Sequence, residues 1–188
     1  PKNTINFNHK TEDAVIKARS SKGSDGALLK DSNNNIVKIN FIEKILATVI
    51  AKISNFVPGA GVWMNTQRPE WNDANNALVG NGVSMVTLYY LRRFLTFFNG
   101  LLNKSELKSV AVSEELSESF KDIYNIFNSN KEILSSSNVG DCERKIIMDC
   151  LGETSSKYRS KIYKDSFSGI KKPILIKDIE AFISIALE

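Results

Sequence analysis

Hydrophobic residues from position 41 onward are spaced as in amphipathic helices. Apolar side chains recur there every three or four residues and so share one face, which predicts a helix. The residues of this face are Phe41, Ile42, Ile45, Leu46, Val49, Ile50 and Ile53. Pro58 and Gly59 are helix breakers and should end it. Residues 62–65 are then expected to form an extended link.

The longest apolar run spans residues 74–102 and predicts a second, longer helix. Its apolar side chains lie nearly all round the helix axis, which is typical of a helix that is buried on most sides. Gly80 and Gly82 lower the helix propensity. They either permit close packing or mark a break between a short helix and a longer one. Because Arg92 and Arg93 interrupt the run, we expect no membrane span.

Three further helices are predicted in the second half of the chain. Ser113 is a suitable N-cap for the first, whose apolar face would consist of Leu116, Phe120, Ile123, Ile126 and Phe127. Asp141 would cap a second helix that reaches about residue 163, and a third would occupy residues 177–188. A short strand is expected at residues 174–176.

The polar N-terminal part differs from these helices. Residues 1–40 are rich in Asn, Ser and Lys, with one short helix expected at residues 11–20 and Thr11 as its N-cap. We therefore expect a polar N-terminal segment with loops, residues 1–40, and an α-helical domain, residues 41–188. The predicted fold class is all-α, with helical hairpins joined by short extended links.

Composition favours a packed domain and argues against several partners. Hydrophobic residues make up 42% of the 188 residues and charged residues 24%, so a core can form. The net charge is only +4, without a Lys/Arg block that alternates with aromatic residues, so we expect no nucleic-acid partner. The first residues lack the apolar core of a signal peptide, and a cytoplasmic location is expected.

The two cysteines and the single histidine argue against metal and thiol chemistry. Cys142 and Cys150 lie eight residues apart on one predicted helix, about 12 Å along its axis. That separation is too large for a disulfide, and with His9 alone the two cysteines cannot form a structural zinc site. We expect both to be small buried hydrophobic residues, and we expect neither a metal nor a cofactor.

Residues 67–76 carry the densest group of chemically useful side chains, just before the long apolar run. One interpretation is structural, with Asn72 or Asp73 as a helix N-cap. In it, Glu70 is a surface charge and Trp71 packs on the core.

The other interpretation of this segment is a sugar site. The flat face of Trp71 suits stacking on a sugar ring, and amides supply both donors and acceptors for hydroxyl groups: Asn65, Asn72, Asn75 and Asn76. A carboxyl group crowded by an indole and another acid would have its pKa raised toward that of a general acid.

Residues 70–76 resemble a motif of the cellobiose and chitobiose phosphorylase family, enzymes of the (α/α)6-toroid architecture. The family motif is Asp-Trp-Asn-Asp-Gly-x-Asn, and this chain has Glu70-Trp71-Asn72-Asp73-Ala74-Asn75-Asn76. Glu70 thus replaces the first Asp, and Ala74 replaces the Gly. A toroid of twelve helices needs far more chain than this, so the resemblance implies that these residues form about half of one. The remainder would come from missing chain or a partner subunit.

The resemblance also implies a reaction, the cleavage of a glycosidic bond in a disaccharide or oligosaccharide with inversion. Asp73 would be the general acid that protonates the glycosidic oxygen, and Trp71 would line the sugar subsite. The other substrate-binding residues would be Arg68, Glu70, Asn72, Asn75 and Asn76. The nucleophile would be inorganic phosphate, as a co-substrate, or water.

Hydrolysis would need a second carboxylate to activate water. By residue type alone the candidates are Glu114, Glu115, Asp141 and Glu143. The alternative to an enzyme is a non-catalytic α-helical domain that binds carbohydrate or another protein.

Overall fold

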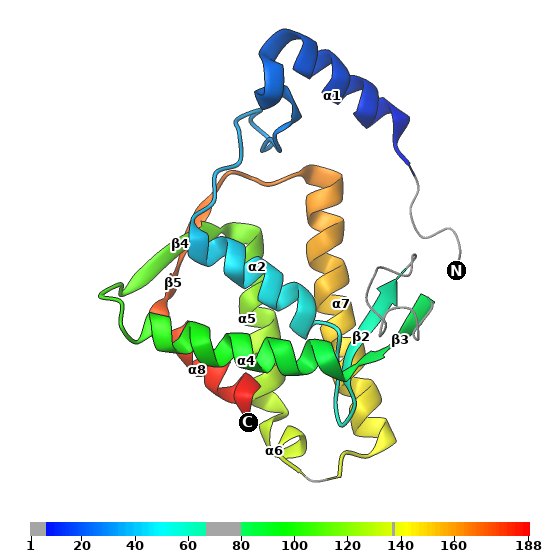
Figure 1. The fold of residues 1–188 in the computed structure, drawn as a ribbon, viewed down its shortest axis with the longest axis vertical. Helices are drawn as coiled ribbons and strands as arrows, with labels where there is room; N and C mark the ends of the chain where they lie inside the picture. The colour runs from blue at the N-terminus through cyan, green and yellow to red at the C-terminus, as the bar shows by residue number, and fades with distance from the viewer. Residues whose placement is uncertain (1–6, 67–79, 137) are drawn as a thin grey trace.

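The computed structural model describes residues 7–66, 80–136 and 138–188. Helix α1 (His9–Lys22) and the short 3-10 helix η1 (Gly23–Ala27) project from the rest of the molecule (Figure 1). Asn8, and not the predicted Thr11, caps α1, because its side chain accepts a hydrogen bond from the Thr11 amide at 3.1 Å. None of the residues of α1 is buried.

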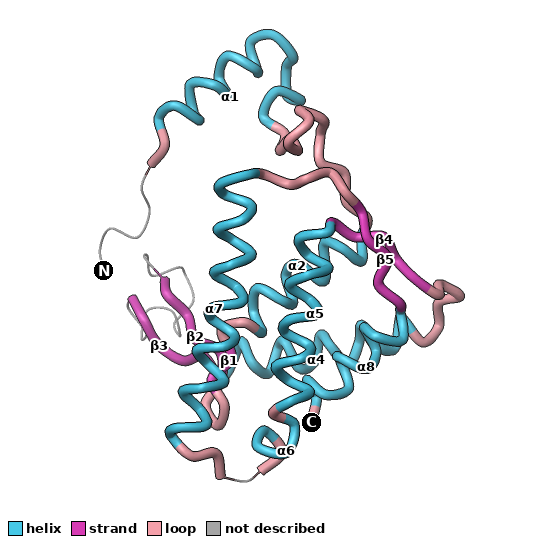
Figure 2. Tube along the Cα trace, turned by 180° about the vertical axis from the view of Figure 1, so that it is seen from behind, coloured by secondary structure: helices cyan, strands magenta, loops and turns pink. Residues whose placement is uncertain are grey.

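Helix α5 (Glu114–Ser129) lies at the centre of the molecule, between α7 (Asp141–Asp165) on one side and α2 (Phe41–Ile53) and α8 (Ile176–Leu187) on the other (Figures 1 and 2). Its predicted apolar face is confirmed, since four of the five predicted residues are buried: Leu116, Phe120, Ile123 and Phe127. The predicted helix from Phe41 is also confirmed. It follows Asn40, whose side chain accepts a hydrogen bond from the Glu43 amide at 2.8 Å.

Two small antiparallel sheets accompany these helices. The first has the order β1 (Phe56–Val57), β2 (Gly61–Thr66), β3 (Gly80–Ser84). The second pairs β4 (Ser109–Ser113) with β5 (Lys171–Leu175). Each strand of the second sheet runs directly into a helix, β4 into α5 and β5 into α8, so the sheet fixes where both helices begin.

The predicted fold class, an all-α set of helical hairpins forming part of an (α/α) toroid, is therefore wrong. The structure is 65% helical, with 14% strand in two small antiparallel sheets, so the fold is mainly helical but mixed. The strand expected at residues 174–176 overlaps the end of β5, and the extended link expected at residues 62–65 is part of β2. Strands β1, β3 and β4 were not predicted, because they are short and because β3 is rich in glycine. In addition, β4 pairs with a strand about sixty residues further along the chain, which a local pattern cannot reveal.

Helix α4 (Met85–Leu102) corrects the prediction of one helix over residues 74–102. Residues 80–84 form β3 instead, and Ser84 caps α4 by accepting a hydrogen bond from the Thr87 amide at 3.1 Å. The helix is not buried on most sides either. Its buried residues are Leu95, Phe98 and Leu102, whereas several large apolar residues are exposed: Met85, Val86, Tyr89, Tyr90, Phe94, Phe97 and Leu101.

Helix α7 begins at Asp141 as predicted, but Gly140 occupies the N-cap position, and Asp141 instead pairs with Arg144. The prediction of buried cysteines is wrong, because Cys142 and Cys150 are exposed free thiols. A short α6 (Lys131–Leu134) precedes the loop that leads to α7. Among the described helices, none combines the length and the apolar character needed to cross a membrane.

Candidate functional site

The residues of the predicted sugar site fall in residues 67–79, outside the described part of the chain: Arg68, Glu70, Trp71, Asn72, Asp73, Asn75 and Asn76. The two ends of this segment are described. Strands β2 and β3 pair antiparallel as far as Thr66 and Gly80, and β3 continues into α4. The predicted site residues therefore belong to the connection between two paired strands, the kind of connection that often carries function.

A polar cleft of about 350 Å³ lies between the middle of α7 and the corner that joins α2 to β1. Its walls carry hydroxyl, amide, carboxylate and guanidinium groups, so it presents both hydrogen-bond donors and acceptors. The polar lining residues are Ser54, Asn55, Asp149, Glu153, Ser155, Ser156 and Arg159. This cleft was not predictable from the sequence, because two of its lining residues precede the others by about a hundred positions.

Arg159 is held in place within the cleft. Its two terminal nitrogens, Nη1 and Nη2, donate to the hydroxyls of Ser155 at 2.8 Å and Ser156 at 3.2 Å. Asp149 pairs with Lys145 one turn earlier on α7. A guanidinium with a fixed orientation and a nearby carboxylate, Glu153, is an arrangement suited to binding a ligand rich in hydroxyl groups.

The cleft is also connected to the first half of β2, the strand that precedes the segment of the predicted sugar site. Asn55, one of its lining residues, accepts a hydrogen bond at its carbonyl oxygen from the Trp63 amide on β2 at 2.7 Å. The Trp63 side chain is exposed. Three residues further along, Thr66 makes the last β2 pairing before residue 67.

The four carboxylates proposed by residue type are not brought together. Glu114 and Glu115 begin α5, whereas Asp141 and Glu143 begin α7. These two helices are antiparallel neighbours, as their ion pairs Glu118–Lys161 and Asp122–Lys157 show, so their first turns lie at opposite ends of the molecule (Figure 1).

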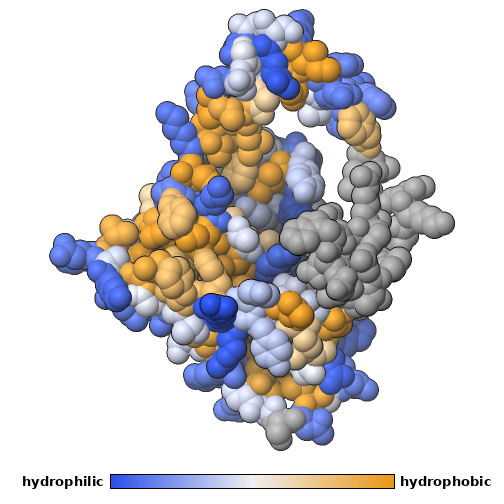
Figure 3. Space-filling model, viewed as in Figure 1, coloured by the Kyte–Doolittle hydropathy of each residue, from blue (hydrophilic) through white to orange (hydrophobic). Residues whose placement is uncertain are grey.

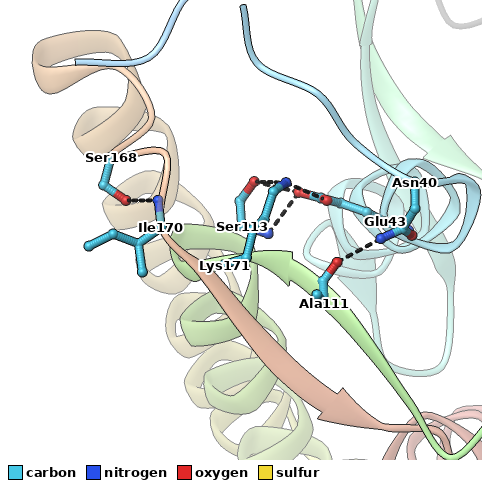
Figure 4. Close-up of polar contacts among 7 residues, drawn as sticks. All are labelled: Asn40, Glu43, Ala111, Ser113, Ser168, Ile170 and Lys171. Carbon is cyan, nitrogen blue, oxygen red and sulfur yellow. Dashed lines mark hydrogen bonds and ion pairs between the residues drawn. The ribbon is translucent and has the colours of Figure 1, made fainter. Parts of the chain in front are cut away.

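Glu43 is the centre of a buried polar cluster that joins α2 to both strands of the second sheet (Figure 4). Its Oε1 accepts hydrogen bonds from the amide, at 2.8 Å, and from the hydroxyl of Ser113. Its Oε2 accepts from Lys171 Nζ at 2.8 Å, and the same ammonium donates to the Ser113 hydroxyl at 3.2 Å. Glu43 and Ser113 are 2% and 3% exposed, so substrate cannot reach them and the cluster is structural.

Glu115 forms a second buried contact beside this cluster. It accepts a hydrogen bond at Oε1 from the Ser168 amide at 2.8 Å, which ties α5 to the chain just before β5. Burial acts to raise the pKa of Glu115, but hydrogen bonds from the Ser168 amide, its own amide and the Ser168 hydroxyl outweigh burial and lower it below the ordinary 4.5. This carboxylate therefore stabilises the fold when it is ionised.

A consequence of this lowered pKa is a loss of stability in acid. The contribution of Glu115 is fully present above its unfolded pKa and disappears as the pH falls through the lower folded value. We expect the unfolding free energy of the wild type, measured by urea denaturation, to decrease between about pH 5 and pH 3. The decrease in unfolding free energy per pH unit should be smaller in Glu115→Gln.

The control for this experiment is Glu132→Gln, which removes an exposed carboxylate from α6. If the pH dependence of the unfolding free energy is reduced equally in both variants, Glu115 has no special part in the acid sensitivity.

An apolar groove of about 380 Å³ runs between α2 and α4. Hydrophobic side chains gather over these two helices on the face seen in Figure 3. The residues that line it are Phe41, Lys44, Ile45, Thr48, Val49 and Lys52 from α2, and Thr87, Tyr90, Leu91 and Phe94 from α4. The sequence showed that both helices are apolar, but not that they leave this space between them.

Comparison with known proteins assigns this chain to no family. No family model and no curated protein matches it. Within residues 7–66, 80–136 and 138–188, no group of three or more His, Cys, Asp or Glu side chains is arranged to hold a metal ion.

Proposed function

We propose that the chain is part of a carbohydrate-active enzyme that cleaves a glycosidic bond by inversion, with Asp73 as the general acid. The observation that carries the proposal is the sequence Glu70-Trp71-Asn72-Asp73-Ala74-Asn75-Asn76, in which an acid, an indole and several amides are adjacent. The residues on either side support it, since this segment joins two paired strands, and functional side chains are commonly carried by connections of this kind.

A second observation that supports the proposal is the polar cleft on α7, whose lining residue Asn55 accepts a hydrogen bond from the Trp63 amide of β2. Its hydroxyl, amide and guanidinium groups suit the hydroxyls of a disaccharide or oligosaccharide. In the hydrolytic form of the reaction, Glu153 would be the base that activates water. In the phosphorolytic form, inorganic phosphate would be the nucleophile, with Arg159 as a group able to bind it.

We also place the reaction in the cytoplasm. The support is that Cys142 and Cys150 are exposed free thiols, which persist in a reducing compartment.

The test is turnover of a panel of α- and β-linked disaccharides by the protein, with and without phosphate, and by Asp73→Asn. The amide keeps the shape of the side chain but has no acidic proton, so turnover should fall at least about 100-fold while disaccharide binding persists. Release of a sugar phosphate only with phosphate would identify a phosphorylase. Phosphate-independent release that is also lost in Glu153→Gln would identify a hydrolase.

The matched control is Asp165→Asn, which removes an exposed carboxylate at the end of α7. It should keep the wild-type rate. Full activity of Asp73→Asn, or turnover of none of the disaccharides by the wild type, would contradict the proposal.

The second candidate function is a non-catalytic binding domain, and the apolar groove between α2 and α4 is the observation that favours it. Under this function neither the wild type nor Asp73→Asn would turn over any glycoside.

A further inference from the structure

The α2–α4 groove leaves large apolar side chains exposed to water. Phe41 is 72% exposed and Tyr90 is 68% exposed, and both line the groove together with Leu91 and Phe94. Large apolar patches on a monomer mark sites of association, because covering them removes apolar area from water. The groove volume of about 380 Å³ lies within the range of binding pockets.

The shape of the groove suits an α-helix as its occupant. Its walls are two helices, so each wall presents ridges of side chains spaced three and four residues apart. An amphipathic helix that lies along such walls can pack its own ridges between them, which is a recurring mode of peptide recognition. Helix α2 has 13 residues, so a helix of comparable length, about 20 Å, would cover the groove.

The charge of the groove indicates which helix fits. Lys44 and Lys52 are the charged residues among those that line it, and both are on the α2 wall. They are eight residues apart, which places them about 12 Å apart along the helix axis. Acidic side chains about two turns apart on the occupant would meet both ammonium groups.

The same two lysines argue against a second copy of this chain as the occupant. A symmetric dimer brings identical surfaces together, so the lysines of one copy would approach the groove that carries the lysines of the other. Like charges juxtaposed at an interface disfavour association.

We propose that the groove between α2 and α4 binds an amphipathic helix of a partner protein, with the apolar face of that helix against Phe41, Tyr90, Leu91 and Phe94 and its acidic residues facing Lys44 and Lys52. The site is separate from the predicted sugar site and does not depend on the proposed glycosidic reaction.

The test uses two synthetic helical peptides as probes, each about 18 residues long and labelled with fluorescein. They share an apolar stripe and differ only on its flanks, which carry glutamates in one and lysines in the other. Fluorescence anisotropy should show that the glutamate peptide binds at least about tenfold more tightly, because each of two partly screened ion pairs adds to affinity. The double variant Lys44→Glu/Lys52→Glu should reverse this preference.

The apolar contribution is tested separately. Tyr90→Asp should weaken binding of the glutamate peptide at least about tenfold, because it places a charge in the apolar groove. Tyr163→Asp is the matched control, since Tyr163 is 82% exposed on α7 and does not line the groove. Both replaced side chains are exposed, so circular dichroism should show that both variants fold.

Three results would overturn the proposal. The first is that neither peptide binds. The second is that both peptides bind equally and that Lys44→Glu/Lys52→Glu does not change this. The third is a dimer, seen in sedimentation, that Tyr90→Asp dissociates. The last would show that a second copy fills the groove. Glycoside turnover is a separate measurement, so its presence or absence neither supports nor contradicts peptide binding.

Discussion

Phe182→Ala should cost about 3–5 kcal/mol of unfolding free energy, the usual range for removing a buried aromatic ring. Phe182 is fully buried on α8 and meets three rings of α5 edge-on, those of Phe120, Tyr124 and Phe127, with centroids 5.4, 6.3 and 6.1 Å away. The substitution leaves a cavity between the two helices and removes all three aromatic contacts.

Urea denaturation followed by circular dichroism would measure this loss. Phe97→Ala is the control, because Phe97 is 62% exposed on α4 and its removal should change stability by less than about 1 kcal/mol. Similar losses in the two variants would mean that α8 is not anchored to α5 by its aromatic residue.

Glu43→Ala should be the second strongly destabilising substitution, at about 3 kcal/mol. It removes the acceptor for the buried Ser113 amide and hydroxyl and the partner of Lys171. A buried donor left without an acceptor costs about 1–3 kcal/mol. Because Lys171 is about one-third exposed, its ammonium can turn toward water, which limits its share of the loss.

The control for this prediction is Glu114→Ala, which breaks the more exposed pair between Glu114 at the start of α5 and Lys172 on β5. Exposed pairs contribute less than about 1 kcal/mol. If thermal and urea denaturation gave the same loss for both variants, the buried cluster would contribute no more than a surface ion pair.

The helices were predictable where apolar residues form a stripe along one face. Residues 41–53 and 114–129 show this stripe, and the structure has α2 and α5 there. The predicted cap of α5 was wrong in its chemistry, because Ser113 precedes the helix without a capping hydrogen bond and donates its hydroxyl to Glu43. The start of α4 was misplaced because Val83 continues the apolar run, whereas the pairing of Gly82 with Met64 makes this stretch a strand. That pairing depends on two segments about eighteen residues apart, so no local pattern contains it.

The candidate sites differ in how far they can be predicted from the sequence. The segment around Asp73 was found from the sequence, because its side chains are adjacent along the chain. The polar cleft was not found, because the fold is what brings Asn55 and Arg159, which are far apart in the sequence, to line the same cleft. The groove was missed for a different reason, since the exposure of Tyr90 and Phe94 depends on what other helices leave uncovered.

The pairing of β4 with β5 also bears on the order in which the chain can fold during its synthesis. Residues 109–113 leave the ribosome about sixty residues before 171–175, the strand with which they pair. Until α8 follows, Phe120 and Phe127 lack the ring of Phe182 that covers them in the finished molecule. The nascent chain therefore carries an uncovered aromatic surface on α5 while about sixty further residues are synthesised. Exposed apolar surface of this kind makes a chain prone to aggregation and is the reason that chaperones are needed.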